Sequence, residues 1–277
     1  MRAATGFVRS SVAGYGLLLA AAPFAYGADI VIATPKQIVV TMVDHENAEM
    51  LHKAHYVYVS QERSERTGGH LWTERVAETQ VGKIRMLMAV DGQPLSGERL
   101  TAERARIGGI VSDPAAFQRS AQAAKDDEVH AQAMLNLLPR AFVFENQRRD
   151  GSLLRIDFKP NPAYEPQSME ERVLHGMSGS IAIDEQSGRL LHLEGRLPAD
   201  VSIGFGLLAT IKAGSNFSTT RGTVIGNEWK TAVVDTDING RAVFFKSIGR
   251  KEHAEHSEFH MLPAGMTVAQ TAQMLIQ

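Results

Sequence analysis

Short turns between alternating segments constrain the fold of this chain more than any other sequence feature. AFVFENQRRDGSLLRIDFKP and SGSIAIDEQSGRLLHLEGRLP each alternate apolar and polar residues on both sides of a turn. The turns, Asp150-Gly151 and the sequence EQSG, have the composition of hairpin loops. Parallel strands would need crossover connections of roughly a dozen residues or more. We therefore expect an antiparallel meander and not a parallel α/β sheet.

Further strands are predicted on both sides of these hairpins. Before them come HYVYVSQERSER, GGHLWTERVAETQ and VGKIRMLMAVDGQP. In the last of these, Ile84, Met86, Met88 and Val90 alternate with Arg85, Leu87 and Ala89. After them come VSIGFGLLATIKAG, read as one strand, then STTRGTVIG, NEWKTAVVDTDI, an Asn239-Gly240 turn and RAVFFKSIGR. Long, strongly twisted antiparallel sheets tend to curl. The sequence therefore predicts a strongly curved antiparallel sheet.

Two regions have helical character instead. Pro35 followed by an apolar stripe predicts a first helix, because proline suits the first turn of a helix. Residues 98–138 are rich in Ala, Glu, Gln and Arg and predict a helical insert between strands. Within it, Asp113-Pro114 is a plausible helix start, and Pro139 is expected to end that helix. The fold class is thus α+β.

The N-terminal residues predict export. Arg2 and Arg9 precede an uncharged apolar stretch, and small residues near Ala28 suit a cleavage site, so residues 1–28 are expected to be a signal peptide. The apolar stretch is short for a membrane span of about 20 residues. We expect a periplasmic protein whose single domain covers residues 29–277. Secretion, or an anchor formed by an uncleaved N-terminus, is the less favoured alternative.

Composition excludes some classes of function. The chain has no cysteine, which argues against a lipid-modified N-terminus and against disulfides, so the fold must be held by core burial. Without residues 1–28, 29 basic residues become 27 against 31 acidic ones, and the net charge changes from −2 to −4. A mildly acidic chain gives no electrostatic reason to expect a nucleic-acid partner.

The order of elements resembles the periplasmic outer-membrane lipoprotein-carrier (LolA/LolB-like) superfamily. GSIAIDEQSGRLLHLEGRL, with Gly188 in its turn, is similar to paired strands of that family. GNEWKTAVVDTDINGRAVFFKSIGRKEHAEHSEFHML is similar to its closing strands, with Trp229 opening one and Gly240-Arg241 starting the next. The resemblance implies an incomplete barrel with helices over its concave face and an interior that accepts lipid acyl chains. No functional residue of the family is carried over to this chain.

Apolar strand positions either line such a cavity or pack beneath the helices, and the sequence leaves both alternatives open. Methionines would suit an adaptable lipid pocket. The candidate ligand-binding residues are Met86, Met88, Ile156, Phe158, Ile183, Leu193, Phe205 and Leu207.

The histidines of KEHAEHSEFH raise a different hypothesis. On a helix, His253, His256 and His260 would share a face and could bind a metal ion. On a strand, His256 and His260 would share a face about 13 Å apart, and His253 would point the other way. The strand is favoured because Phe259 and Met261 then fall on one face. In a strand, these three histidines could not form a metal site by themselves.

Two other segments are similar to catalytic or cofactor-binding motifs, but their surroundings in the sequence argue against these functions. GMSGS, at residues 176–180, lacks the final glycine of a nucleophile elbow and opens a strand. GFGLLA, at residues 204–209, has no helix behind it to bind a dinucleotide.

The leading hypothesis is a non-catalytic, cofactor-free carrier of lipid or lipoprotein acyl chains, with transient contacts to the membrane or to envelope proteins. A metal-binding envelope protein or metal-dependent enzyme, and an envelope-sensing interaction module, are the alternatives.

Overall fold

The computed structural model describes residues 33–277 except 52–53, 204–208, 226–227 and 243–246. The predicted signal segment and two of the cavity candidates, Phe205 and Leu207, lie outside the described residues. The helices are α1 (Pro35–Leu51), α2 (Gly97–Ser112), α3 (Pro114–Ala141), α4 (Met169–His175) and α5 (Val268–Leu275). The strands are β1 (Tyr56–Ser64), β2 (Trp72–Glu78), β3 (Lys83–Val90), β4 (Gln93–Pro94), β5 (Phe142–Asp150), β6 (Leu153–Pro160), β7 (Ser178–Asp184), β8 (Arg189–Arg196), β9 (Val201–Ile203), β10 (Ala209–Ile211), β11 (Asn216–Thr223), β12 (Trp229–Ala242) and β13 (Ser247–Met261).

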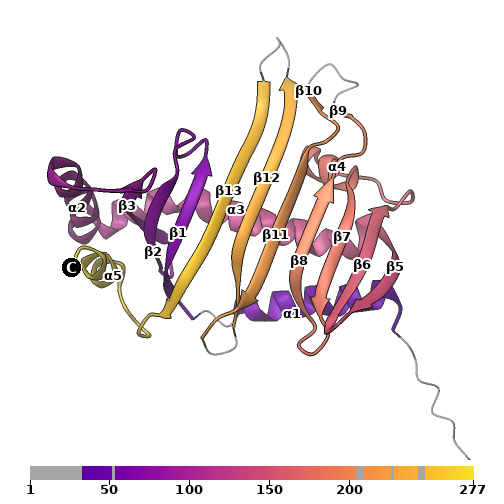
Figure 1. The fold of residues 1–277 in the computed structure, drawn as a ribbon, viewed down its shortest axis with the longest axis horizontal. Coiled ribbons are helices and arrows are strands. Elements are labelled where there is room, and N and C mark those ends of the chain that lie inside the picture. The colour runs from indigo at the N-terminus through magenta and orange to yellow at the C-terminus, as the bar shows by residue number, and fades with distance from the viewer. Residues whose placement is uncertain (1–32, 52–53, 204–208, 226–227, 243–246) are drawn as a thin grey trace, which may run out of the picture. The chain divides into compact units, whose positions relative to one another are not determined.

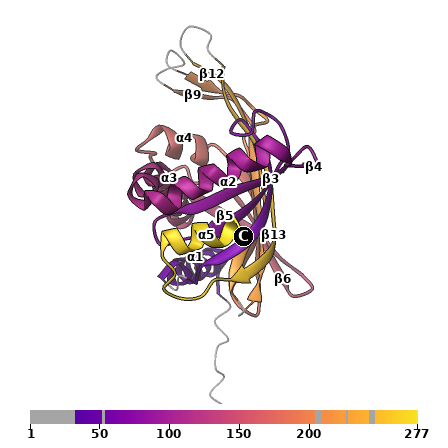
Figure 2. The same cartoon turned by 90° about the vertical axis from the view of Figure 1, so that its left-hand side faces the viewer.

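All of these strands belong to one antiparallel sheet (Figure 1). Its main path is β4-β3-β2-β1-β13-β12-β11-β8-β7-β6-β5, and β9 and β10 extend it beside β12. The sheet is curved and remains open, with helices packed on it (Figure 2). The predicted fold class, α+β with a curved antiparallel sheet covered by helices, is therefore confirmed.

Strand register defines which side chains share a face, because directly paired residues point to the same side of a sheet. One row crosses the sheet through Ile156, Ile181, Leu193, Thr219, Val234, Ala254 and Glu62. Ile156, Ile181 and Leu193 pack with α1 and α3 in a buried cluster. We call the face that carries this row the inner face and the opposite one the outer face.

The main core lies between the inner face of β5–β8 and helices α1 and α3. Ile156 and Ile181 are fully buried there, together with Val39 and Met42 of α1. Phe142 and Phe158 meet edge to face, with ring centroids 4.8 Å apart, which suits the charge distribution of aromatic rings. Burial of these apolar side chains is the principal force that holds α1 and α3 on the sheet.

A second cluster forms at the β2–β3 end. Ala77 and Ile84 pair with each other and pack against α2 and α5. Their neighbours in sequence, Val76 and Arg85, form the adjacent pair and therefore face the inner side. Thus α2 and α5 pack on the outer side of this end, whereas the inner side of β2 and β3 carries charged residues.

Ion pairs between poorly exposed side chains hold α1 on the sheet. Glu46 is 3% exposed and accepts hydrogen bonds from Arg189 Nε at 2.9 Å and from the Leu190 N–H at 3.1 Å. Arg221 also pairs with Glu46, and Glu49 accepts from Arg189 Nη1 at 2.6 Å. Two carboxylates and two guanidinium groups thus neutralise each other beneath α1. Breaking such a group by removing one member is costly, because a buried charge is left without its partner.

Three sequence predictions of local structure were wrong. Residues 201–203 and 209–211 form two paired strands, β9 and β10, and not one. Asn239-Gly240 is no turn: β12 continues to Ala242 because Asn239 and Gly240 pair with Gly249 and Ile248 of β13. Gly240-Arg241 therefore does not start a new strand.

The third wrong prediction concerns the end of α3. The helix passes through Pro139 and ends at Ala141. Proline removes one hydrogen-bond donor and is unfavourable inside a helix. Here the last turn is retained because Leu137, Leu138 and Ala141 are buried in the main core, and the Phe142 N–H caps the helix at the Leu138 carbonyl.

The main core generates a stability prediction. Replacing Ile156 with alanine leaves a cavity between β6 and the helices, so the free energy of unfolding should fall by about 2–5 kcal/mol, measured by urea denaturation. Val143, on the neighbouring strand β5, is 38% exposed and serves as the control. Val143→Ala should change stability by no more than about 0.5 kcal/mol. Equal effects of the two substitutions would contradict this packing.

Candidate functional site

A cleft of 790 Å³ opens at the edge strand β3, bordered by inner-side residues of β2 and β3, by α2 and by the start of α3. Its walls combine aromatic and aliphatic side chains with four basic residues. We call it the arginine cleft; it is lined by Arg66, Trp72, Glu74, Lys83, Arg85, Leu87, Glu103, Arg106, Gly109, Ile110, Asp113, Ala116, Phe117 and Ser120. The volume falls in the range of about 300–1,000 Å³ that is usual for small-molecule sites.

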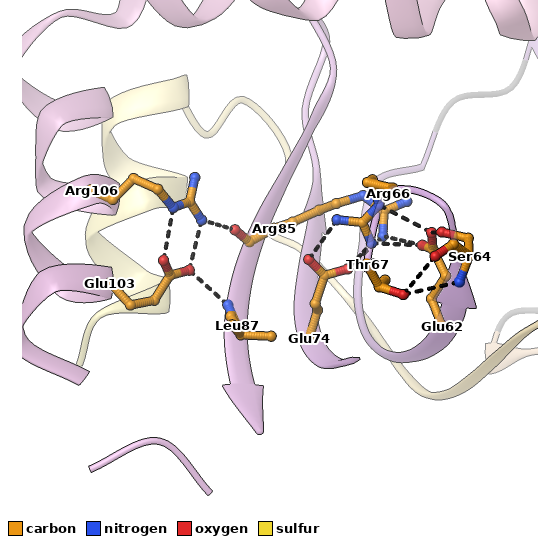
Figure 3. A network of polar contacts seen from close by, with 9 residues as sticks. All are labelled: Glu62, Ser64, Arg66, Thr67, Glu74, Arg85, Leu87, Glu103 and Arg106. Atoms are coloured by element: carbon orange, nitrogen blue, oxygen red, sulfur yellow. Dashed lines mark hydrogen bonds and ion pairs between the residues drawn. The ribbon is translucent and has the colours of Figure 1, made fainter. Parts of the chain in front are cut away.

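A network of carboxylates and guanidinium groups forms the floor of the arginine cleft (Figure 3). Arg66 binds two carboxylates at once: Nε and Nη2 donate to Glu62 at 3.1 and 2.6 Å, and Nη1 and Nη2 donate to Glu74 at 3.0 and 2.6 Å. Arg85 Nη1 donates to Glu74 at 3.0 Å. Paired, multiply hydrogen-bonded arginines of this kind have fixed orientations.

Local structure explains how these groups meet. Glu62 and Glu74 lie on β1 and β2 at inner-face positions, since Ser60 pairs with Glu74 and Glu62 pairs with Trp72. Arg66 belongs to the turn after β1, in which Thr67 Oγ1 accepts the Ser64 N–H at 3.0 Å. The Arg66 guanidinium also lies 5.3 Å from the ring centroid of Trp72, within reach of a cation–π contact.

Helix α2 closes the exposed edge of β3 with two side chains. Glu103 accepts the Leu87 N–H at 2.7 Å, and Arg106 Nη2 donates to the Arg85 carbonyl at 2.5 Å. The two side chains also bind each other, with 2.8 Å between Arg106 Nε and Glu103 Oε2. Backbone groups at the edge of a sheet readily pair with another strand. Glu103 and Arg106 occupy two of these groups and fix the width of the cleft.

The network shifts the pKa values of Glu62, Glu103 and Arg66. Burial disfavours the charged form of Glu62, but hydrogen bonds from Arg66 and Ser64 outweigh burial, and the pKa lies below its usual value. For Glu103, burial is again outweighed, here by Arg106 and the Leu87 N–H, and the pKa is lowered. Burial opposes the charge of Arg66, yet its bonds to Glu62 and Glu74 raise its pKa. All of these groups are therefore ionised near neutral pH.

The structure divides the predicted cavity residues among several surroundings. Ile156, Phe158, Ile183 and Leu193 pack together in the main core, and Met86 packs with α2 and α5 in the second cluster. Met88 is 37% exposed, because β3 has one extra residue where Thr73 pairs with Ala89 and Glu74 with Leu87. None of these six residues lines the arginine cleft. Their binding of an acyl chain stays a prediction.

The predicted strand over KEHAEHSEFH is confirmed, but its faces differ from expectation. Ser257 and His260 pair with Val59 and Val57, which leaves an extra residue in β13 next to Glu258, whose φ is +54°. This bulge reverses the alternation, so His260 shares the outer face with His253, and His256 points inward. The prediction that His256 and His260 share a face was wrong.

The three histidines do not converge on one point. His253 lies between Asp235 and Glu255, with Nδ1 2.6 Å from Asp235 Oδ1. His256 Nδ1 lies 3.1 Å from the Thr231 carbonyl, and its ring is 5.1 Å from that of Tyr58. Within the part of the chain that the structure describes, no group of three or more His, Asp or Glu residues is arranged to hold a metal ion.

Sequence reasoning missed the arginine cleft. One signal was available: the alternation that places Ile84 and Met86 on one side of β3 places Lys83, Arg85 and Leu87 on the other. Such charged alternation is ordinarily interpreted as a solvent-facing side. The pairing of Glu62 and Glu74 with these arginines depends on contacts between separate strands, which a single segment does not reveal.

Comparisons with known proteins give little. No known family matches the sequence, and no curated protein matches it either. A solved structure described as an outer membrane lipoprotein-sorting protein domain from Vibrio parahaemolyticus is similar with a TM-score of 0.28 and 8% identity, covering 86% of this chain and 100% of that one. Among the described helices, none is both long enough and apolar enough to cross a membrane.

The buried carboxylates generate a pH prediction. The folded-state pKa of Glu62 lies below the unfolded value of about 4.3, so its stabilisation is present above that pH and is lost as the pH falls further. Glu62→Gln should lower the free energy of unfolding by about 1.5–3 kcal/mol at neutral pH. The difference from wild type should shrink in acid. Urea denaturation across the acid range measures this, with the exposed Glu165→Gln as the control; a difference that grows in acid would contradict the assignment.

His253 generates a second pH prediction. Its hydrogen bond to Asp235 raises its pKa, whereas burial lowers the pKa of His256. Asp235→Asn should move the pKa of His253 down towards about 6.5 and leave that of His256 low, as measured by NMR titration. Because a raised pKa stabilises the fold below the unfolded value, the stability lost in Asp235→Asn should be greatest at about pH 5.5 and vanish as the pH rises through the folded pKa. An unchanged His253 titration would refute the pairing.

Proposed function

We propose that this protein is a non-catalytic binding protein for amphiphilic molecules with acyl chains, such as lipids or lipoprotein acyl chains, and that the arginine cleft is their entry site. The observation that carries the proposal is the composition of the cleft. Leu87, Ile110 and Phe117 provide apolar surface, and basic side chains border it. A site of this kind accepts a molecule with an apolar part and a polar end.

Burial of the acyl chain supplies the binding energy. Each CH₂ group removed from water contributes about 0.8 kcal/mol, so a few groups held against the apolar wall suffice for measurable binding. The predicted cavity residues of the main core already pack tightly against α1 and α3. A long chain would therefore extend inward from the cleft only if these helices move away from the inner face.

The setting of the proposal is the cell envelope. We place the mature chain in the periplasm, exported by residues 1–28, with residues 29–277 acting as one domain. In this setting the protein would receive an acyl chain from a membrane or an envelope protein through transient contact and keep it out of water during transfer. No cofactor or metal ion is needed for this function.

The proposal can be tested by filling the cleft. Gly109 lines it, and a Cβ atom added there meets no atom within 4 Å outside its own helix turn. Gly109→Trp should therefore fold normally and reduce the affinity for a fluorescent fatty acid by about tenfold or more, because the apolar wall is occupied. The neighbouring Gly108 has equally open surroundings but does not line the cleft, so Gly108→Trp is a matched control.

Lipid mass spectrometry of the purified wild-type protein provides an independent readout. Co-purified lipid in the wild type and in Gly108→Trp, but less in Gly109→Trp, is the expected result. No co-purified lipid, together with no binding of the fluorescent fatty acid to wild type, would refute the proposed function. Equal binding by both tryptophan variants would refute the location.

A further inference from the structure

We infer that the arginine cleft selects amphiphiles by an anionic headgroup, a carboxylate or a phosphate, held by Arg85 and Arg106. This inference rests on the proposed function and specifies its ligand class. The observation that supports it is a difference in burial: around the cleft, the acidic side chains are more buried than the basic ones.

The acidic and basic side chains of the network differ in exposure. Glu74 and Glu103 have side chains that are only 3% and 11% exposed, whereas those of Arg66 and Arg106 are 40% and 54% exposed. The Arg85 side chain is 30% exposed, and Glu62 beneath it is 8% exposed. The carboxylates therefore lie underneath the guanidinium groups. Although the charges nearly balance in number, the surface that a ligand meets is cationic.

Asp113, the third carboxylate among the residues that line the cleft, does not reverse this field. Asp113 accepts the Ala116 N–H at 3.0 Å and caps the N-terminus of α3, a helix of 28 residues. A carboxylate in this position is offset by the positive end of the helix dipole. The N-terminus of α3 thus reduces the negative charge that Asp113 adds to the cleft wall.

Arg106 and Arg85 are well placed to bind an anion. Arg106 uses Nε and Nη2 for Glu103 and the Arg85 carbonyl, and Arg85 uses Nη1 for Glu74. Among the described residues, these contacts leave Nη1 of Arg106 and Nη2 of Arg85 available to a ligand. Guanidinium groups remain charged at all physiological pH values and match the geometry of carboxylate and phosphate.

The headgroup and chain sites adjoin each other. Arg85 and Leu87 lie on the same side of β3, two residues apart, and Arg106 precedes Ile110 by one turn of α2. An anion at the arginines therefore places its attached chain against Leu87, Ile110 and Phe117. A neutral or cationic headgroup would have to cover the same guanidinium groups without compensating their charge, which is unfavourable.

The test compares four probes with the same dodecyl chain: laurate, dodecyl phosphate, dodecyl maltoside and dodecyltrimethylammonium, each below its micelle concentration in calorimetric titrations. Laurate and dodecyl phosphate should bind wild type at least about tenfold more tightly than the maltoside, since a charge-assisted hydrogen bond contributes roughly one such factor. Added salt should reduce this preference. The two anionic probes together show whether carboxylate or phosphate is preferred.

Two variants assign the preference to the cleft. Arg106→Gln should weaken the binding of the anionic probes to about the affinity of the maltoside, a larger loss than any change in maltoside binding itself. Arg104→Gln, on an exposed position of the same helix, is the matched control and should behave as wild type. If Arg106→Gln proves unstable because β3 loses its edge contact, Arg85→Gln tests the same assignment from the strand.

Each outcome decides a different point. Equal affinity of wild type for all four probes would overturn headgroup selection and leave the proposed function standing. Tighter binding of the cationic probe would likewise overturn it. No binding of any probe would overturn the proposed function itself. A parallel loss of maltoside and laurate binding in Arg106→Gln and Arg85→Gln would show that these arginines only support the fold. That result would also overturn the inference.

Discussion

The pairing of β1 with β13 is the interaction on which the rest of the structure depends. It joins Tyr56–Ser64 to residues 252–261, almost two hundred positions later, and thereby unites the first strands and the C-terminal meander in one sheet. The loop entropy of such a long-range contact must be overcome by many contacts formed together. Here eight paired positions, together with stacking of Tyr58 on Phe259 at 4.9 Å, provide them.

This pairing also joins an aliphatic part and a charged part on the inner face of the same sheet. The inner-face row is aliphatic from Ile156 to Leu193, passes through Thr219 and Val234, and reaches Glu62 on the far side of β13. At the aliphatic half, α1 and α3 fill the face with a close-packed core. At the charged half, close packing of that kind is impossible without leaving charges unpaired. An open cleft is therefore found where the row becomes polar.

Turn chemistry predicted the meander because its hairpins are local. Gly151 and Gly188 adopt the left-handed backbone that those turns need, with φ values of +63° and +66°. Asn239-Gly240 has the same composition but is held in β12 by Gly249 and Ile248 of β13. Local preference is weaker than a full ladder of backbone hydrogen bonds, and the sequence does not show which segment supplies the ladder.

The site was less predictable than the fold for a related reason. Apolar alternation correctly marks buried strand faces such as Ile156 and Ile183, but burial alone does not distinguish core from cavity. The bulge next to Glu258 moved His260 to the other face, and an extra residue in β3 exposed Met88. The burial of Glu62 and Glu74 could not be predicted from the sequence, because glutamates are expected at the surface unless their arginine partners are known.

The buried acids give the arginines of the cleft a property that surface arginines lack. A free arginine side chain loses rotamer entropy when it binds a ligand, which weakens the complex. Arg85 and Arg106 are already held by Glu74 and Glu103 in the folded protein, so little of this loss remains at the moment of binding. In the proposed site the carboxylates would thus act as positioning residues beneath the ligand. Their burial explains why the outward surface of the network is cationic.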